Sequence, residues 1–150
     1  MFYAVTQPVL VGDELWIYYN GFPYGVSEKV ALKRGAYFRA RLRLDGFISA
    51  DALYTGGELV TKPLRFSGDQ LVINADTSAG GAIRVEIMDD NGVSFEGYSL
   101  IQADELNGNS VKIPVTWQGK SDVRKLAGKV VSLRFVMRSC KLYSYQFVDG

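Results

Sequence analysis

Hydrophobic and polar residues alternate along much of this chain, which is the pattern of β-strands that bury one face. The alternation is clearest over residues 36–44, where arginines alternate with apolar residues. We expect the apolar side chains to face a core and the arginines to face solvent. The predicted inward residues are Phe38, Ala40, Leu42 and Leu44, and the predicted outward residues are Arg39, Arg41 and Arg43.

Three more parts of the chain show the same alternation. Residues 83–87 lead into the turn sequence at 89–92 and then into 93–100, which together predict a β-hairpin. Residues 111–117 and 131–138 predict two further strands, each with a buried row of side chains. The proline in the first of these favours a sheet edge, because proline cannot donate a backbone hydrogen bond.

Shorter strands are expected between turns rich in glycine and aspartate. They fall at 8–11, 14–19, 58–62, 70–75 and 140–148. Only 27–33 and 121–126 have a helical composition, and both are too short to define an architecture. About ten short strands with regularly spaced turns predict an all-β fold, an antiparallel β-sandwich or jelly roll preceded by an aromatic-rich β-hairpin.

Aromatic residues divide the chain into two regions. About half of the Trp, Tyr and Phe residues lie before the point at which the alternation becomes regular. We therefore predict an aromatic-rich β-hairpin segment at 1–44 and a β-sandwich domain at 45–150. Aromatic rings can stack on saccharides or fill an interface. Both uses remain open for the candidate ligand-binding residues Tyr18, Tyr19, Phe22 and Tyr24.

Composition excludes several classes of function. The 150 residues include 17 Lys and Arg against 16 Asp and Glu, a net charge of +1, which argues against a nucleic-acid partner. Histidine is absent, so Ser-His-Asp catalysis and imidazole metal sites are excluded. The one cysteine, Cys140, lies in an apolar stretch and is expected to be a buried, inert thiol.

The N-terminal sequence and the apolar runs bear on location. The chain begins with neither the basic nor the apolar region of a signal peptide. No apolar run reaches the length of a transmembrane helix. We therefore expect a soluble, cytoplasmic protein with no membrane partner.

Carboxylates are the remaining candidates for catalysis, because glycosidases can work with two acidic residues and no histidine. Most acidic residues stand beside Gly, Asn or Ser, where Asp caps its own turn. We therefore predict no catalytic residue, no metal site and no cofactor, and interpret 89–92 as a turn rather than a calcium loop. A phosphate or an acidic sugar would fit the arginine row at 39–43, but we expect an ordinary solvent-facing strand there.

Several segments stand in a distinctive order, with LDGFIS at 44–49, GELVTKP at 57–63 and VTWQG at 115–119. The others are 71–77, 83–92, 97–100, 131–138 and 142–147. Together they resemble the β-sandwich at the C-terminal end of some bacterial glycosidase-like proteins, where it follows a five-bladed β-propeller similar to that of fructosidases and arabinanases. Residues 8–21 resemble part of a late propeller blade.

The resemblance implies an accessory, carbohydrate-associated module, and it transfers no catalytic residue to this chain. We therefore expect a noncatalytic glycosidase-accessory or carbohydrate-binding-like β-sandwich. The alternative is a structural or protein-interaction module that self-assembles through its N-terminal hairpin, and a small carboxylate enzyme is a third hypothesis. The expected partners are a saccharide and a second copy of the chain, with a homodimer favoured.

Overall fold

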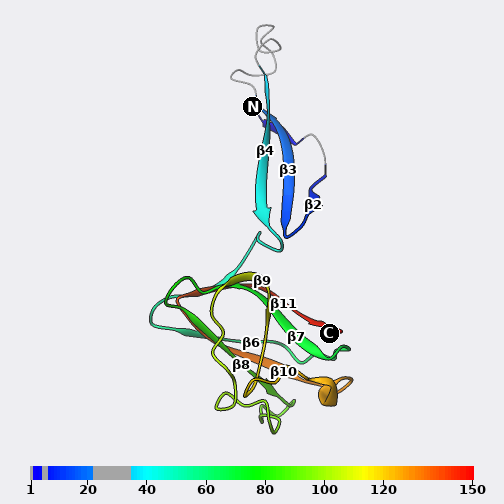
Figure 1. The fold of residues 1–150 in the computed structure, drawn as a ribbon, viewed down its shortest axis with the longest axis vertical. Coiled ribbons are helices and arrows are strands. Elements are labelled where there is room, and N and C mark those ends of the chain that lie inside the picture. Colours follow the sequence, from blue (N-terminus) through cyan, green and yellow to red (C-terminus); the bar gives the residue numbers. More distant parts are fainter. Residues whose placement is uncertain (1, 5–6, 22–34) are drawn as a thin grey trace. The chain divides into compact units, whose positions relative to one another are not determined.

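The computed structural model of the chain describes residues 2–4, 7–21 and 35–150. These residues form eleven β-strands and one short 3₁₀ turn, Arg124–Leu126, so the fold is all-β as predicted (Figure 1). No helix among them is long enough and apolar enough to cross a membrane. The chain folds as two compact units, Met1–Phe47 and Ile48–Gly150.

The N-terminal unit is an antiparallel sheet built around one central strand. Its strands are β1 (Phe2–Ala4), β2 (Val9–Val11), β3 (Glu14–Gly21) and β4 (Ala36–Arg43). β3 pairs with β4 along one side and with β2 and β1 in succession along the other. The strands expected at 8–11 and 14–19 correspond to β2 and β3, which belong to a sheet larger than a hairpin.

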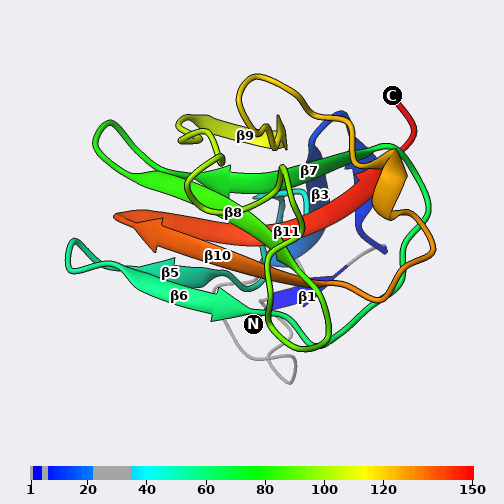
Figure 2. The ribbon, with the colours of Figure 1, turned by 90° about the horizontal axis from the view of Figure 1, so that it is seen from below.

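The C-terminal unit is an antiparallel β-sandwich, as predicted. Its strands are β5 (Ala50–Ala52), β6 (Gly57–Val60), β7 (Gln70–Asp76), β8 (Ala82–Met88), β9 (Asn109–Pro114), β10 (Ser132–Arg138) and β11 (Cys140–Val148). One sheet has the order β5-β11-β7-β9 and the other β6-β10-β8. The two sheets form two layers (Figure 1), and their strands run in similar directions (Figure 2). β9 is an edge strand, where Pro114 is tolerated.

The core lies between the two sheets of the sandwich. Phe135 on β10 is 0% exposed and lies opposite Val85 of β8 in register. Trp117 is also buried, and its indole Nε1 donates a 2.8 Å hydrogen bond to the Val85 carbonyl. Cys140 is buried in the same core, as predicted. The buried residues of the two clearest rows are Ile83, Val85, Ile87, Leu133, Phe135 and Met137.

The hairpin strand predicted at 93–100 is wrong, because this segment forms turns and one isolated bridge. The Asp89 carboxylate accepts hydrogen bonds from the backbone N–H groups of Asn91 and Val93. These bonds close the turn, and the chain then pairs with β8 through the isolated bridge between Met88 and Ser94 before it turns again at 96–97. Among the described strands, β8 therefore pairs along its length only with β10, and its other side carries isolated backbone hydrogen bonds such as those between Ile83 and Leu106.

The burial predicted for one side of β4 is also wrong. The alternation itself is correct, but Phe38 is 45% exposed and Ala40 is exposed as well. No second layer of described residues within the N-terminal unit covers this side. Alternation determines which residues share a face, whereas burial also requires a second layer.

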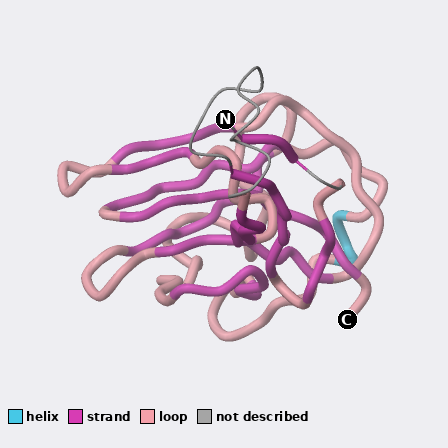
Figure 3. The backbone as a smooth tube through the Cα atoms, turned by 90° about the horizontal axis from the view of Figure 1, so that it is seen from above, coloured by secondary structure: helices cyan, strands magenta, loops and turns pink. Residues whose placement is uncertain are grey.

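Two short strands, β1 and β5, were not predicted. Each has three residues, and β5 has the sequence Ala-Asp-Ala, which has low intrinsic β propensity. β5 forms because it pairs with β11, where Lys141 Nζ also lies 3.5 Å from Asp51 Oδ2. The helical candidate at 121–126 is the short turn seen in Figure 3, and the candidate at 27–33 lies outside the described residues.

Candidate functional site

The N-terminal sheet has two chemically different faces, because successive side chains of each strand point to opposite sides. We call one the apolar face: Leu10 of β2, Leu15, Ile17 and Tyr19 of β3, and Phe38, Ala40 and Leu42 of β4. We call the other the aromatic–arginine face: Val9 and Val11 of β2, Glu14, Trp16, Tyr18 and Asn20 of β3, and Tyr37, Arg39, Arg41 and Arg43 of β4.

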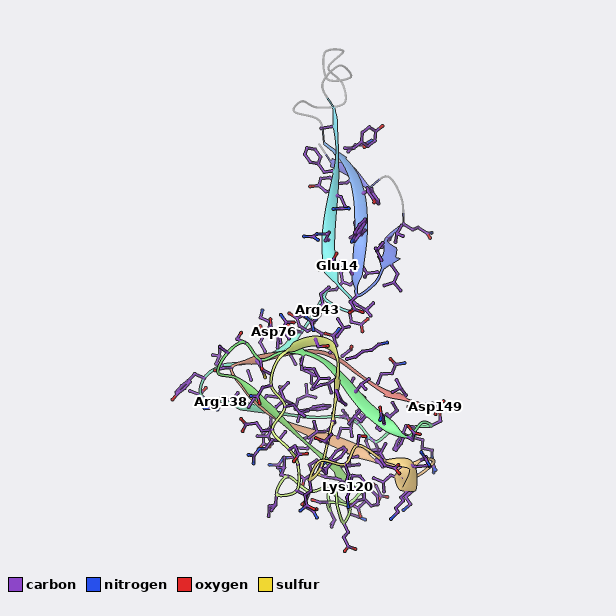
Figure 4. The ribbon with its side chains drawn as sticks, in the orientation of Figure 1. Glu14, Arg43, Asp76, Lys120, Arg138 and Asp149 are labelled. Atoms are coloured by element: carbon purple, nitrogen blue, oxygen red, sulfur yellow. The ribbon has the colours of Figure 1, made fainter. Side chains whose placement is uncertain are left out.

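Trp16 is the centre of the aromatic–arginine face. The Arg39 guanidinium carbon lies 3.8 Å from the indole centroid, which is a close cation–π contact. The indole Nε1 donates a 2.9 Å hydrogen bond to Glu14 Oε2. Arg41 Nη1 lies 3.7 Å from the other oxygen of Glu14, which Figure 4 labels. These contacts link the indole and the carboxylate of β3 to two guanidinium groups of β4.

Two tyrosines extend this face. Tyr18 meets Trp16 edge to face, with ring centroids 6.5 Å apart at 72°. Tyr18 is 37% exposed and Tyr37 is 80% exposed. Tyr18 pairs with Arg39 and Tyr37 pairs with Asn20, so the two tyrosines are diagonal neighbours on one side of the sheet. The result is a surface of aromatic rings with guanidinium donors and a carboxylate acceptor beside them.

The structure separates the residues predicted to bind a ligand. Tyr18 lies on the aromatic–arginine face, whereas Tyr19 lies on the apolar face and stacks on Phe38 with ring centroids 5.3 Å apart. Adjacent residues of a strand cannot share a face. Phe22 and Tyr24 lie outside the described residues.

Trp16, Tyr37 and Arg39 were not predicted as members of the site. A signal for Trp16 was present, because it stands two residues before Tyr18 and therefore shares its face. The arginine row was noticed, but sequence alone did not show that β4 pairs with β3 in a register that brings Arg39 over the indole.

The sandwich has two open grooves of its own. The larger, about 560 Å³, is lined by Glu58, Arg84, Glu105 and Arg138 among others. Two of its charges form an ion pair, with Arg84 Nη2 at 3.5 Å from Glu105 Oε2. The smaller, about 330 Å³, has a mainly apolar lining that includes Tyr143 and Tyr145.

The carboxylates of the sandwich serve structural contacts. A side-chain hydrogen bond from Arg134 lowers the pKa of Glu58. Hydrogen bonds from the Thr116 side chain and from the Gly119 N–H lower the pKa of Asp104. A general acid needs a raised pKa, so these two groups do not fit that role.

Cys140 and the acidic side chains are the remaining candidates for a nucleophile or a metal ligand. Burial raises the pKa of the Cys140 thiol, which disfavours the reactive thiolate. Within 2–4, 7–21 and 35–150, no three Asp, Glu or Cys side chains cluster in a way that would hold a metal ion. Comparison of the chain with protein-family models, with curated proteins and with solved structures found no match.

Proposed function

We propose that this chain is a noncatalytic saccharide-binding protein whose binding surface is the aromatic–arginine face. The observation that carries the proposal is the exposure of Tyr18 and Tyr37 on the same side of the sheet as a Trp16 indole already held by Arg39. The resemblance to glycosidase-like proteins implies an accessory role, and saccharide binding without catalysis is such a role.

The chemistry of this face suits a sugar chain. Tyrosine rings offer a flat apolar surface for the C–H face of a pyranose, and their hydroxyls remain available for hydrogen bonds. Arg39 and Asn20 can donate hydrogen bonds to ring hydroxyls, and Glu14 can accept them. Three arginines against one glutamate make the face cationic, which favours an acidic saccharide over a neutral one.

Affinity gel electrophoresis tests the proposal. We expect an acidic polysaccharide such as polygalacturonate or alginate to retard the protein more than a neutral β-glucan does. Tyr18→Ala and Tyr37→Ala should each weaken binding roughly fivefold, equivalent to about 1 kcal/mol of lost ring contact. Added salt should weaken binding to the acidic polymer, because exposed charges are screened.

Tyr54→Ala is the matched control, since Tyr54 is 80% exposed but lies in a turn of the sandwich. It should bind like the unaltered protein. Absence of retardation by every polysaccharide, or an equal loss in all three tyrosine variants, would refute this site.

A further inference from the structure

The apolar face of the N-terminal sheet lacks charged side chains and is partly exposed. None of its members defined above is charged, and they span three adjacent strands. Leu10 is 59% exposed and Phe38 is 45% exposed, with no second layer of described residues within their unit. A contiguous exposed apolar surface of this kind marks an interaction site.

We propose that a second copy of this chain covers the apolar face, with the two sheets packed face to face about a two-fold axis. The proposal is independent of saccharide binding. A face without charges is complementary to itself, since two copies can meet without burying an unpaired ion. Isologous two-fold packing is the commonest arrangement of homo-oligomers.

Two copies could also join edge to edge through β4, but the charges on β4 argue against that arrangement. Among the described residues, β4 pairs only with β3. Antiparallel addition of a second β4 at its other edge would place the row Arg39, Arg41 and Arg43 beside the same row of the partner. Like charges on neighbouring strands destabilise pairing, and charged edge strands prevent such addition in many sheets. Packing through the apolar face avoids this repulsion.

The area of the apolar face determines how tightly two copies should bind each other. β3 and β4, with eight residues each, and β2, with three, cover roughly 300 Å² of flat surface per copy. A standard interface buries about 800 Å² per partner. The sheet therefore supplies less than half of a standard interface, and we expect a weak, reversible dimer that dissociates at micromolar concentration. Both aromatic–arginine faces would then point outward, which gives the dimer two equivalent outer surfaces.

Sedimentation equilibrium of the full chain tests the proposal. The mass should rise with concentration from the 16.6 kDa of one chain toward twice that value. Phe38→Glu and Ala40→Glu each place a charge within the apolar face at an exposed position, so both variants should remain monomeric at every concentration. Tyr37→Glu is the matched control on the opposite face, and it should dimerise like the unaltered chain.

A mixing experiment separates loss of the interface from loss of the fold. Phe38→Glu and Phe38→Lys should each be monomeric alone and should form a mixed dimer together, because opposite charges then meet across the interface. Unfolded variants could not recover in this way, and the circular dichroism of each variant checks its fold. A monomeric unaltered chain at about 200 µM, or an Ala40→Glu variant that still dimerises normally, would overturn the proposal.

Discussion

At the residue scale, the side chain of Arg134 links three strands of the sandwich. Its guanidinium donates to Glu58 Oε1 of β6 at 2.8 Å and to Glu86 Oε2 of β8 at 3.2 Å. Glu86 is only 6% exposed and also accepts a hydrogen bond from the Ser94 hydroxyl. Removing Arg134 would leave a buried carboxylate without its cation, which is costly. The alternation places Arg134 and Glu86 on the outer side of their strands, but neither is a plain surface residue.

The deepest aromatic residue gives the first stability prediction. Phe135 is 0% exposed, so Phe135→Ala should cost about 3–5 kcal/mol through lost burial and a residual cavity. Lys62→Ala, at an exposed position after β6, should cost no more than about 0.5 kcal/mol. Arg134→Ala should destabilise more than Lys62→Ala for the reason given above. Urea denaturation measures all three, and equal losses for Phe135 and Lys62 would contradict the assigned core.

Asp104 gives a prediction about pH. Its pKa in the folded chain lies below the usual value, because the Thr116 side chain and the Gly119 N–H stabilise the carboxylate. A lowered folded pKa means that its stabilising contribution is present above about pH 4 and is lost as the pH falls through the folded pKa. Asp104→Asn should therefore lower stability at pH 7 and reduce the loss of stability between pH 7 and about pH 3.

Urea denaturation at several pH values tests this expectation. Asp90→Asn, at an exposed position in the turn after β8, serves as the comparison. The result would contradict the role of Asp104 if its variant lost stability in acid as steeply as the unaltered chain.

At the scale of elements, the turn between β7 and β8 depends on a close backbone approach. A Cβ at Gly81 would lie 2.1 Å from the Ser139 carbonyl oxygen and 2.3 Å from that of Thr77. Gly81→Ala should therefore cost about 1–3 kcal/mol or more, because the two turns must move apart. At the neighbouring Gly80 a Cβ meets nothing within 4 Å, so Gly80→Ala should be nearly neutral. Thermal melting compares the two variants. A loss in Gly81→Ala alone reflects the close backbone approach, whereas an equal loss in both reflects the reduced flexibility of the turn.

Alternation predicted the strands that are buried on one side by a second sheet. β10 and β11 appear close to their predicted bounds, since the rows that include Phe135 and Leu142 are buried. The strand predicted at 93–100 is absent because a second turn at 96–97 ends the pairing with β8 soon after the turn that Asp89 caps, and hydrophobic spacing does not detect this turn.

The candidate site could be predicted only in part. Spacing by two residues places Trp16 with Tyr18 and separates both from Tyr19. The partnership of Trp16 with Arg39 depends on the register between β3 and β4, which is set by long-range pairing. Sequence spacing therefore identifies the members of a face on one strand, but the neighbours that complete the face come from the fold.

At the scale of the whole molecule, the two units differ in what stabilises them. The buried hydrophobic cluster runs from Ala52 to Leu142 and has no described member before Ile48. The N-terminal sheet instead depends on cross-strand contacts such as Tyr19 with Phe38 and Arg39 with Trp16. A sheet with one apolar face gains stability when another layer covers that face. The sandwich should therefore fold alone, whereas the sheet should gain stability from a partner.

This difference leads to a test with a chain that comprises only Ile48–Gly150. Because this chain retains the whole buried cluster, its melting temperature should stay within about 4 °C of the sandwich transition of the full protein, a shift that corresponds to roughly 1 kcal/mol. It should also be monomeric and unretarded by polysaccharides, because both faces of the N-terminal sheet are gone. Calorimetry, light scattering and affinity electrophoresis provide the three readouts. A truncated chain that still dimerises or still binds the polymer would move both functions to the sandwich, where its two open grooves are the surfaces to examine by substitution at Arg138 and Tyr145.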